Sequence, residues 1–276
     1  MKRFLVLAAC LASFSGAAAA APYAIKTTEP DANEPPAGKL TMAQIVDKNL
    51  AARGGLKAWR AVNTLTMSGR LEVGGKDDPE LPFVMRMKRP HKSRLEIRFE
   101  EQTALQVYDG QQGWKVRPYL GRDEVEPYTS AEAREASRWQ ELDGPLVDYE
   151  NKGTKVKLLG TEIVEGHKAY KLELTMKGGD QRNIWIDATT FLESKIDGEP
   201  RKMDGKLRSV AVYYREYRKE SGFTMPHVFE TVVEGGRSYK MYVEQVEFNQ
   251  PMDETLFLKP DLGMVRASTP MKELHP

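Results

Sequence analysis

Residues 81–99 read LPFVMRMKRPHKSRLEIRF, and this stretch decides the fold class. Apolar side chains take every second position on both sides of the turn at Arg89-Pro90. The apolar positions are Leu81, Phe83, Met85 and Met87 before the turn, and Leu95, Ile97 and Phe99 after it. Mostly charged residues lie between them. A period of two is typical of strands with one apolar and one charged face, so the stretch predicts antiparallel strands over 81–88 and 93–100.

The same alternation begins earlier, at residues 64–72, where Leu65, Met67 and Leu71 share one face. Asp109-Gly110 and Gly235-Gly236 are typical of tight hairpin turns. Further strands are predicted at 103–108, 112–118, 154–164, 167–176, 181–187, 190–197, 207–218, 223–234 and 237–248. A sheet of about a dozen strands has to coil to hide its apolar face. The predicted fold is therefore mainly β with a few helices, built on a strongly curved antiparallel sheet of about 11–12 strands around an apolar cavity.

Two helices are predicted, each from a capping box. Thr41 and Gln44 have the spacing that begins a helix, which Gly54-Gly55 ends. A short turn follows with Trp59, interpreted as a packing anchor between helix and sheet. Thr129 and Glu132 have the same spacing and predict a helix over 129–142. Because it interrupts the strands, we expect it to act as a lid, with Trp139 and Leu142 inserted into the mouth of the cavity.

Residues 1–20 have the features of a secretory signal peptide. Lys2 and Arg3 precede an apolar run from Phe4 to Phe14, followed by small residues. Cleavage after Ala20 would release a soluble periplasmic protein beginning at Ala21. A second interpretation is a lipoprotein box at 7–10, in which Cys10 carries the lipid. No later stretch approaches the ~20 apolar residues that span a bilayer as a helix.

The remaining sequence predicts one domain. We expect a flexible arm at 21–39, a single half-barrel domain at 40–262 and a loose tail at 263–276. The sequence has 41 basic and 40 acidic residues, and residues 1–20 contain two of the basic ones, Lys2 and Arg3. The exported chain would therefore have 39 basic and 40 acidic residues. Such a balance does not favour binding to nucleic acid or to an anionic membrane. Cys10 is the sole cysteine of the sequence, so the exported chain would have no thiol.

The residue types needed for catalysis do not form a recognisable pattern. His91, His167, His227 and His275 occur singly, without metal-ligand spacing. No nucleophile elbow, phosphate loop or dinucleotide-binding glycine motif is present. Asp187 and Asp197 each end a predicted strand, where a turn-forming aspartate is expected. The sequence therefore predicts a protein that is not an enzyme and has no cofactor and no metal.

Several short motifs carry a resemblance to a known superfamily. They are 51–55 (AARGG) with Ala58-Trp59, 65–69 (LTMSG), 108–110 (YDG) with Gly113-Trp114, 143–146 (DGPL) with Gly153 and 158–166, 184–187 (IWID), and 253–254 with 256–257. Together they resemble the bacterial outer-membrane lipoprotein-sorting (LolA/LolB-like) periplasmic carriers. The resemblance implies a bent antiparallel half-barrel that holds acyl chains in an apolar cavity closed by helices. The charged segment Arg215 to Lys219 departs from this picture and leaves a different lipid cargo equally open.

The expected ligand is a lipid or the acyl chains of a lipoprotein, carried toward the outer membrane without catalysis. The expected cavity residues are Leu65, Met67, Leu71, Leu81, Phe83, Met85, Met87, Leu95, Ile97, Phe99 and Trp114. Methionine is suited to such a site because its flexible thioether adapts to variable apolar shapes. Partners would be an inner-membrane transporter or an outer-membrane acceptor, and no nucleic acid. The alternative is a non-transporting envelope module, such as a stress sensor or an accessory subunit of a transport complex.

Overall fold

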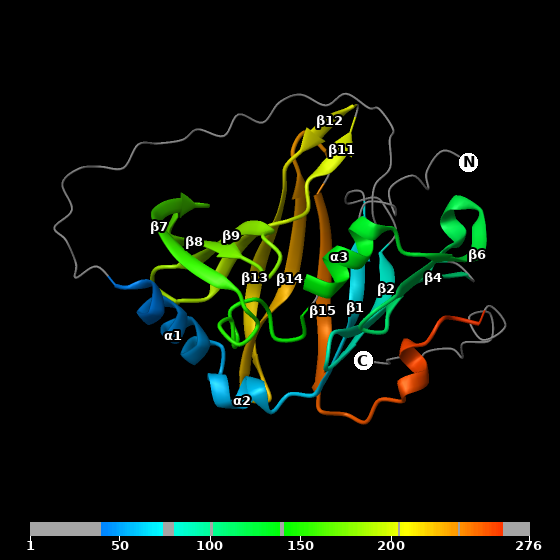
Figure 1. The fold of residues 1–276 in the computed structure, drawn as a ribbon, viewed down its shortest axis with the longest axis horizontal. Coiled ribbons are helices and arrows are strands. Elements are labelled where there is room, and N and C mark those ends of the chain that lie inside the picture. Colours follow the sequence, from blue (N-terminus) through cyan, green and yellow to red (C-terminus); the bar gives the residue numbers. More distant parts are fainter. Residues whose placement is uncertain are drawn as a thin grey trace. The chain divides into compact units, whose positions relative to one another are not determined.

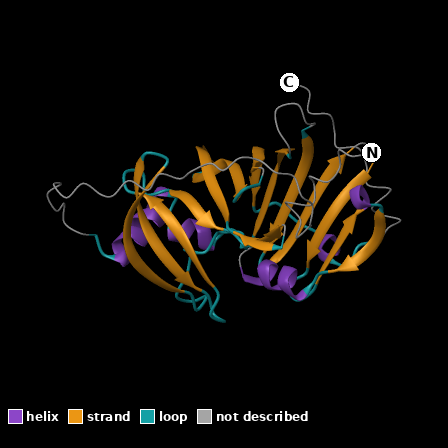
Figure 2. Ribbon diagram, turned by 90° about the horizontal axis from the view of Figure 1, so that it is seen from above, coloured by secondary structure: helices purple, strands orange, loops and turns teal. Residues whose placement is uncertain are grey.

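The computed structural model describes residues 40–73, 80–99, 102–138, 141–203, 205–236 and 238–261. The predicted signal peptide, arm and tail, and the lid residue Trp139, lie outside these ranges. The chain divides into two compact units. Among the described residues, the first unit contains 61–144 and the chain from Met241 onward, and the second contains the chain up to Arg60 and Pro145–Lys240. Strands make up most of both units (Figures 1 and 2).

The described residues of the first unit form an antiparallel sheet, one α-helix and two 3₁₀ turns. Its strand order is β6-β5-β4-β3-β2-β1-β15, so neighbours in sequence are neighbours in the sheet up to β1. The strands are β1 (Thr64–Glu72), β2 (Leu81–Lys88), β3 (Lys92–Phe99), β4 (Gln102–Tyr108), β5 (Gly113–Arg117), β6 (Arg122–Pro127) and, from Met241 onward, β15 (Ser238–Phe248). The helices are α3 (Ser130–Arg138) and the 3₁₀ turns η2 (Pro118–Leu120) and η3 (Glu254–Phe257).

The second unit is also an antiparallel sheet, in the order β14-β13-β10-β9-β8-β7. The strands are β7 (Lys155–Val164), β8 (His167–Thr175), β9 (Gln181–Asp187), β10 (Glu193–Asp197), β13 (Val210–Glu220) and β14 (Phe223–Val233), with a separate hairpin of β11 (Arg201–Met203) and β12 (Lys206–Arg208). The helices of this unit are α1 (Met42–Ala52) and α2 (Leu56–Arg60). The mainly β, antiparallel fold class predicted from the sequence is confirmed.

Local sequence explains where α1 begins and how it is attached. The Thr41 hydroxyl accepts a hydrogen bond from the Gln44 amide, while the Gln44 side chain accepts one from the Thr41 amide, which confirms the capping box. Trp59 has 0% of its surface exposed, and its ring lies 4.7 Å from that of Phe223 on β14. Its indole N–H donates to the Arg53 carbonyl at 3.2 Å. Trp59 is therefore the packing anchor between helix and sheet that the sequence predicted.

A glycine allows close packing of two strands in the first unit. A Cβ atom built on Gly69 of β1 would lie 2.0 Å from the carbonyl oxygen of Tyr242 on β15. Real side chains do not tolerate such a contact, so any larger residue would push the two backbones apart. Gly69 belongs to the 65–69 motif that carries the family resemblance.

Candidate functional site

Ten of the predicted cavity residues lie on one face of the first unit's sheet. In an antiparallel pair, directly opposed residues share a face. Register pairs Met67 with Met85 and Met85 with Leu95, and it pairs Phe83 with Ile97 in the neighbouring row. We call this set the apolar face; its members are Leu65, Met67, Leu71, Leu81, Phe83, Met85, Met87, Leu95, Ile97 and Phe99.

The side chains of the apolar face are largely buried in the structure. Nine of its ten side chains are buried, from 1% exposed at Phe83 to 8% at Met67 and Leu95, and Met85 is half-buried. Transfer of these side chains out of water stabilises the fold by about 25 cal/mol for each Å² buried. A ligand that uses this face therefore has to displace whatever covers it.

Trp114 does not share that face. Register pairs Trp114 with Val107, and Val107 with Arg94, which lies on the charged face of β3. Trp114 packs there against a separate cluster of Leu105, Val107 and Val116. The sequence grouped Trp114 with the cavity residues, whereas register places it on the opposite side of the sheet. Adjacent residues of a strand point to opposite faces, so a one-residue error in phase is enough to reverse the assignment.

A buried ion pair attaches helix α3 to the sheet at the end of the apolar face. The row that contains Met85 and Leu95 continues through Gln106 to Lys115 on β5. The Lys115 ammonium donates to both carboxylate oxygens of Glu132 on α3 at 2.6 Å, and the two side chains are only 5% and 12% exposed. Glu132 also accepts the Thr129 amide at 2.7 Å, which completes the predicted capping box.

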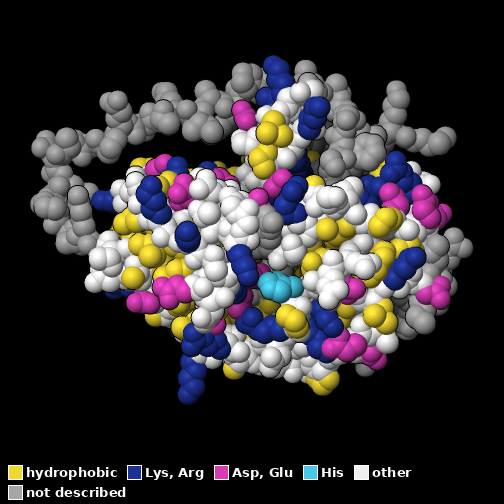
Figure 3. Space-filling view, in the orientation of Figure 1, with side chains coloured by type: hydrophobic (Ala, Val, Ile, Leu, Met, Phe, Trp, Pro, Cys, Tyr) yellow, Lys and Arg dark blue, Asp and Glu magenta, His cyan; other side chains and the backbone are white. Residues whose placement is uncertain are grey.

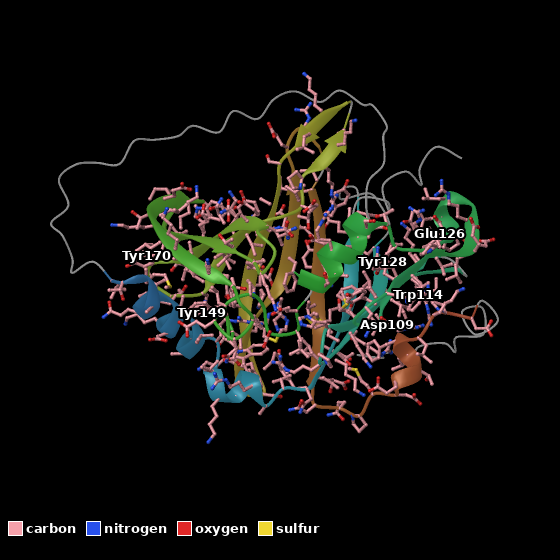
Figure 4. The ribbon with its side chains drawn as sticks, viewed as in Figure 1. Asp109, Trp114, Glu126, Tyr128, Tyr149 and Tyr170 are labelled. Atoms are coloured by element: carbon pink, nitrogen blue, oxygen red, sulfur yellow. The ribbon has the colours of Figure 1, made fainter. Side chains whose placement is uncertain are left out.

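Aromatic residues extend the contact between α3 and the sheet. The rings of Tyr108 and Tyr128 stack with centroids 6.5 Å apart, and Tyr108 is hydrogen-bonded to Ser137 of α3. Burial, with the negative charge of Glu132, raises the pKa of Tyr128 well above its usual value, so this phenol stays neutral. Figure 4 marks Trp114 and Tyr128 in this region. Helix α3 (Ser130–Arg138) confirms the predicted helix as far as Arg138, and it contacts the sheet at Lys115 and Tyr108. Its role as a lid stays a prediction.

The segment after α3 returns to the sheet through another ion pair. Asp143, whose side chain is 1% exposed, accepts from the Arg89 guanidinium at 2.6 Å. Arg89 also donates from Nε to the Val62 carbonyl at 2.7 Å. Leu142, the second predicted lid residue, is half-buried beside this anchor. Both ends of the α3 segment are therefore held by partly or wholly buried charges.

The opposite face carries charged side chains on β2 and β3, as the sequence predicted, whereas on β4 and β5 it carries the apolar cluster described above. Glu96 accepts from Arg86 at 3.1 Å and from Arg94 at 2.6 Å. Arg94 donates further to the Leu256 carbonyl of η3. On the side drawn in Figure 3, basic and acidic side chains are interspersed rather than gathered by sign.

Asp187 and Asp197, expected as turn-forming residues, have structural partners. Asp187 accepts the amides of Thr189 and Thr190, and although burial alone would raise its pKa, these N–H groups hold the pKa below its usual value. Asp197 accepts the backbone and side-chain N–H groups of Asn183. In the described parts of the chain, no group of three or more His, Cys, Asp or Glu side chains could hold a metal ion. None of the described helices is both long and apolar enough to cross a membrane.

Sequence reasoning missed two features of this chain. The first is Lys115, a strand residue that no sequence feature distinguishes from its neighbours and whose role depends on its partner Glu132 on α3. The second is a small pocket in the second unit, formed by α1, α2 and the loop 146–151. Neither has a sequence signal, because both depend on contacts between elements that are not adjacent in the chain.

Several solved structures have a fold similar to that of this chain. No protein-family model and no curated protein sequence matches this chain. A LolA superfamily protein from Nitrosomonas europaea superposes with a TM-score of 0.53 at 15% identity, over 80% of this chain and 99% of that one. A candidate outer membrane lipoprotein-sorting protein domain from Vibrio parahaemolyticus gives a TM-score of 0.53 at 14% identity, over 80% and 97%.

A DUF1329 family protein from Desulfovibrio piger also superposes with a TM-score of 0.53, at 15% identity over 78% of this chain and 95% of that one. At such identities the likeness concerns the fold and not the activity. The architecture agrees with the resemblance carried by the short sequence motifs. The chain therefore has a LolA-like fold.

Proposed function

We propose that this protein is a periplasmic carrier that binds a lipid, or the acyl chains of a lipoprotein, on the apolar face of its first unit. The observation that carries the proposal is the row of adaptable apolar side chains on a LolA-like sheet, with α3 fastened at the end of that row. The curved half-barrel around a cavity belongs to this proposal, with the cavity opening when the cover moves.

Three physical features support a lipid ligand. The face contains three methionines, Met67, Met85 and Met87, and thioethers adapt to chains of different shape. An acyl chain gains about 0.8 kcal/mol for each methylene that it buries, so a site without charged groups is sufficient for binding. The cover is held by an ion pair, which water can replace when the helix moves away.

The proposed location follows from the N-terminal sequence. Residues 1–20 would direct export and be removed, leaving a soluble chain that begins at Ala21. Transfer would run toward the outer membrane, from an inner-membrane transporter to an outer-membrane acceptor. None of the features described requires catalysis, a cofactor or a metal.

Native mass spectrometry with lipid extraction tests the proposal. Protein exported by its own leader in a Gram-negative host should carry a phospholipid or acylated species that organic solvent removes. The stripped protein should then take up a fluorescent fatty acid, and membranes should extract that probe again. Stripped protein that takes up no probe, or that holds lipid which membranes never extract, would contradict a carrier. A stable protein partner in place of lipid would favour the sensor or accessory-subunit alternative.

A further inference from the structure

The second unit has a small hairpin that is separate from its main sheet. Strands β11 (Arg201–Met203) and β12 (Lys206–Arg208) pair with each other in a two-stranded sheet of their own. Figure 1 shows them at one end of β13 and β14. Register pairs Lys202 with Leu207, and directly opposed residues share a face, so these two side chains lie on one face of the hairpin. We call it the outer face.

The other face of the hairpin is supported by the rest of the unit. A Cβ atom built on Gly236 would lie 3.5 Å from the Met203 Cε atom, so Met203 packs on the turn that follows β14. At the base of the hairpin, the Ser209 amide and hydroxyl donate to the Glu234 carboxylate at 3.2 and 2.9 Å. The Glu234 amide donates back to the Ser209 carbonyl at 2.9 Å. These contacts hold the hairpin in place and leave its outer face to solvent.

The outer face presents an apolar side chain to water. Leu207 is 71% exposed, more than any other large hydrophobic residue in the described parts of the chain. Lys202, which is opposite Leu207, is exposed, and so is Lys206, the neighbour of Leu207 toward the tip. Figure 3 shows basic and hydrophobic side chains together on this projection. A single exposed leucine is ordinary on a protein surface, but this one lies between two lysines.

The hairpin carries an excess of positive charge. Residues 201–208 (RKMDGKLR) contain four basic residues and one acidic residue, Asp204, whose side chain lies outside the described ones. No carboxylate of the described residues forms an ion pair with Lys202 or Lys206. The two lysines beside Leu207 are therefore available to a partner with negative charge.

The described carboxylates at the base of the hairpin have other partners. Glu199 pairs with the Arg182 guanidinium at 3.0 Å. Hydrogen bonds from Ser209 lower the pKa of Glu234, and the positive charge of Arg208 lowers it further. The charge of Arg208 is thus partly balanced within the unit, and the uncompensated charge lies nearer the tip.

We propose that this hairpin binds the protein to an anionic lipid surface. Leu207 would enter the boundary between headgroups and acyl chains, while Lys202 and Lys206 stay at the level of the phosphates. The charge balance of the whole chain does not favour such binding, so the contact is confined to the hairpin. An acidic protein surface would pair with the lysines but would leave Leu207 without a matching contact. Binding through one leucine and two lysines is weak and reversible, which allows the protein to leave the membrane again.

Vesicle sedimentation with the lipid-stripped exported chain tests the charge requirement. Vesicles of phosphatidylethanolamine and phosphatidylglycerol should bind the protein, and vesicles of phosphatidylcholine alone should bind it far less. Each basic residue near an anionic surface contributes about fivefold, so Lys202→Gln with Lys206→Gln should lose about 25-fold in affinity. The matched control is Lys155→Gln with Lys157→Gln, two exposed lysines of β7 in the same unit, which should change binding little.

Leu207→Ser separates an apolar contact from attraction between charges. It should weaken binding to the anionic vesicles severalfold, and this ratio to the wild type should persist in added salt, because screening acts on charges. The control is Ile163→Ser on β7, since Ile163 is 65% exposed in the same unit. An environment-sensitive dye on Leu207→Cys should shift its emission to the blue on binding, whereas the same dye on Ile163→Cys should not.

The proposal is overturned if the protein binds phosphatidylcholine vesicles as well as the anionic ones, or if either control loses as much as its hairpin counterpart. If the lysine variant loses binding while Leu207→Ser and the dye show no change, the contact is purely electrostatic and entry of the leucine into lipid is wrong. Absence of binding to both vesicles, with retention on immobilised polyglutamate that the lysine variant loses, would indicate an acidic protein partner instead.

Vesicle binding and cargo uptake are separate measurements. Leu207→Ser should leave the uptake of a fluorescent fatty acid unchanged, and Met85→Glu in the first unit should leave vesicle binding unchanged. The hairpin proposal and the proposed carrier function can therefore fail independently.

Discussion

At the scale of single residues, Arg53 and Glu193 form an ion pair of the second unit that is buried on both sides. Their side chains are 9% and 8% exposed, and the charged atoms are 3.2 Å apart. The Tyr217 hydroxyl donates to the same carboxylate at 3.1 Å, and the Arg53 guanidinium lies 4.7 Å from the Trp59 ring. The pair thus connects the end of α1 to β10 in a region with little water.

Loss of one partner should therefore be costly. Arg53→Met leaves the Glu193 carboxylate buried without its cation, and we expect the free energy of unfolding to fall by about 3–5 kcal/mol in urea titrations. The control is Arg218→Met, whose pair with Glu216 is more than half exposed on both sides and should contribute less than about 1 kcal/mol. Equal effects of the two substitutions would show that burial of the Arg53 pair has no energetic consequence.

The apolar face provides a second test at residue scale. Met85→Glu places a carboxylate in an apolar wall, where it is strongly penalised, so binding of an acyl probe should be lost. Because Met85 is half-buried, the fold should survive, as judged by circular dichroism. Arg86→Glu, on the charged face, should leave probe binding unchanged. Global unfolding of the Met85→Glu variant would instead indicate an ordinary packed core at this position.

At the scale of elements, the two capping boxes allow a matched comparison. Thr129 caps α3 and Thr41 caps α1, each by accepting an amide hydrogen bond at 3.3 Å. Replacement of either by alanine should cost about 1 kcal/mol of local stability. Thr129→Ala should speed acyl-probe uptake in stopped-flow fluorescence because it loosens the proposed lid, whereas Thr41→Ala should not. If both variants take up probe at the wild-type rate, α3 does not control entry.

The ion pairs of Glu254 in the 3₁₀ turn η3 lead us to expect that the stability of the protein falls at acidic pH. Hydrogen bonds from Lys88 and Lys92 lower the pKa of Glu254 to about 2, from 4.5. A lowered folded-state pKa means that this contribution to stability is present above pH 4.5 and is lost as the pH falls toward 2. Glu254→Gln should therefore flatten the decline of the melting temperature between these pH values. Added salt should weaken the effect, because the Glu254 side chain is 58% exposed. An unchanged decline would mean that other carboxylates cause it.

Elements with a strong local signal were predictable from the sequence. The alternating strands, both capping boxes and the hairpin at Asp109-Gly110 follow from side-chain spacing alone. The strand β6 was missed because its sequence, RDEVEP, is charged and has no alternation of apolar and polar residues, and half of its residues are exposed at the edge of the sheet. The short hairpin of β11 and β12 was missed for a similar reason, since a strand of three residues has no period to detect.

The candidate site was predictable only in part. The spacing of apolar residues in one strand shows which side chains share a face, but it does not show which other segments contact that face. Alternation is sufficient to group Phe83, Met85 and Leu95 on one side. It cannot determine the phase between strands, which is why Trp114 was assigned to the wrong side. The Lys115–Glu132 pair and the pocket beside α1 depend on contacts between distant segments, and no local pattern encodes them.

At the scale of the whole molecule, the export hypothesis has a direct test. Expressed with its own leader, the protein should appear in the periplasmic fraction with an intact mass that begins at Ala21 and includes no cysteine. This follows from the small residues before the expected cleavage point. A diacylated Cys10 at the N-terminus would contradict the soluble-carrier proposal and place the protein on a membrane.

Gly69 has a consequence for how the protein could diverge in evolution. Its role is steric, since the backbone of β15 leaves no room for a side chain, and it contacts no ligand in the proposed scheme. A mutation there would damage the sheet whatever the cargo, whereas Met67 or Met85 on the same face could be exchanged for other apolar residues of similar volume at modest cost. Selection would then preserve the LTMSG motif in descendants that have changed their cargo. Shared motifs of this kind record common ancestry of the scaffold, and the cargo has to be determined separately for each descendant.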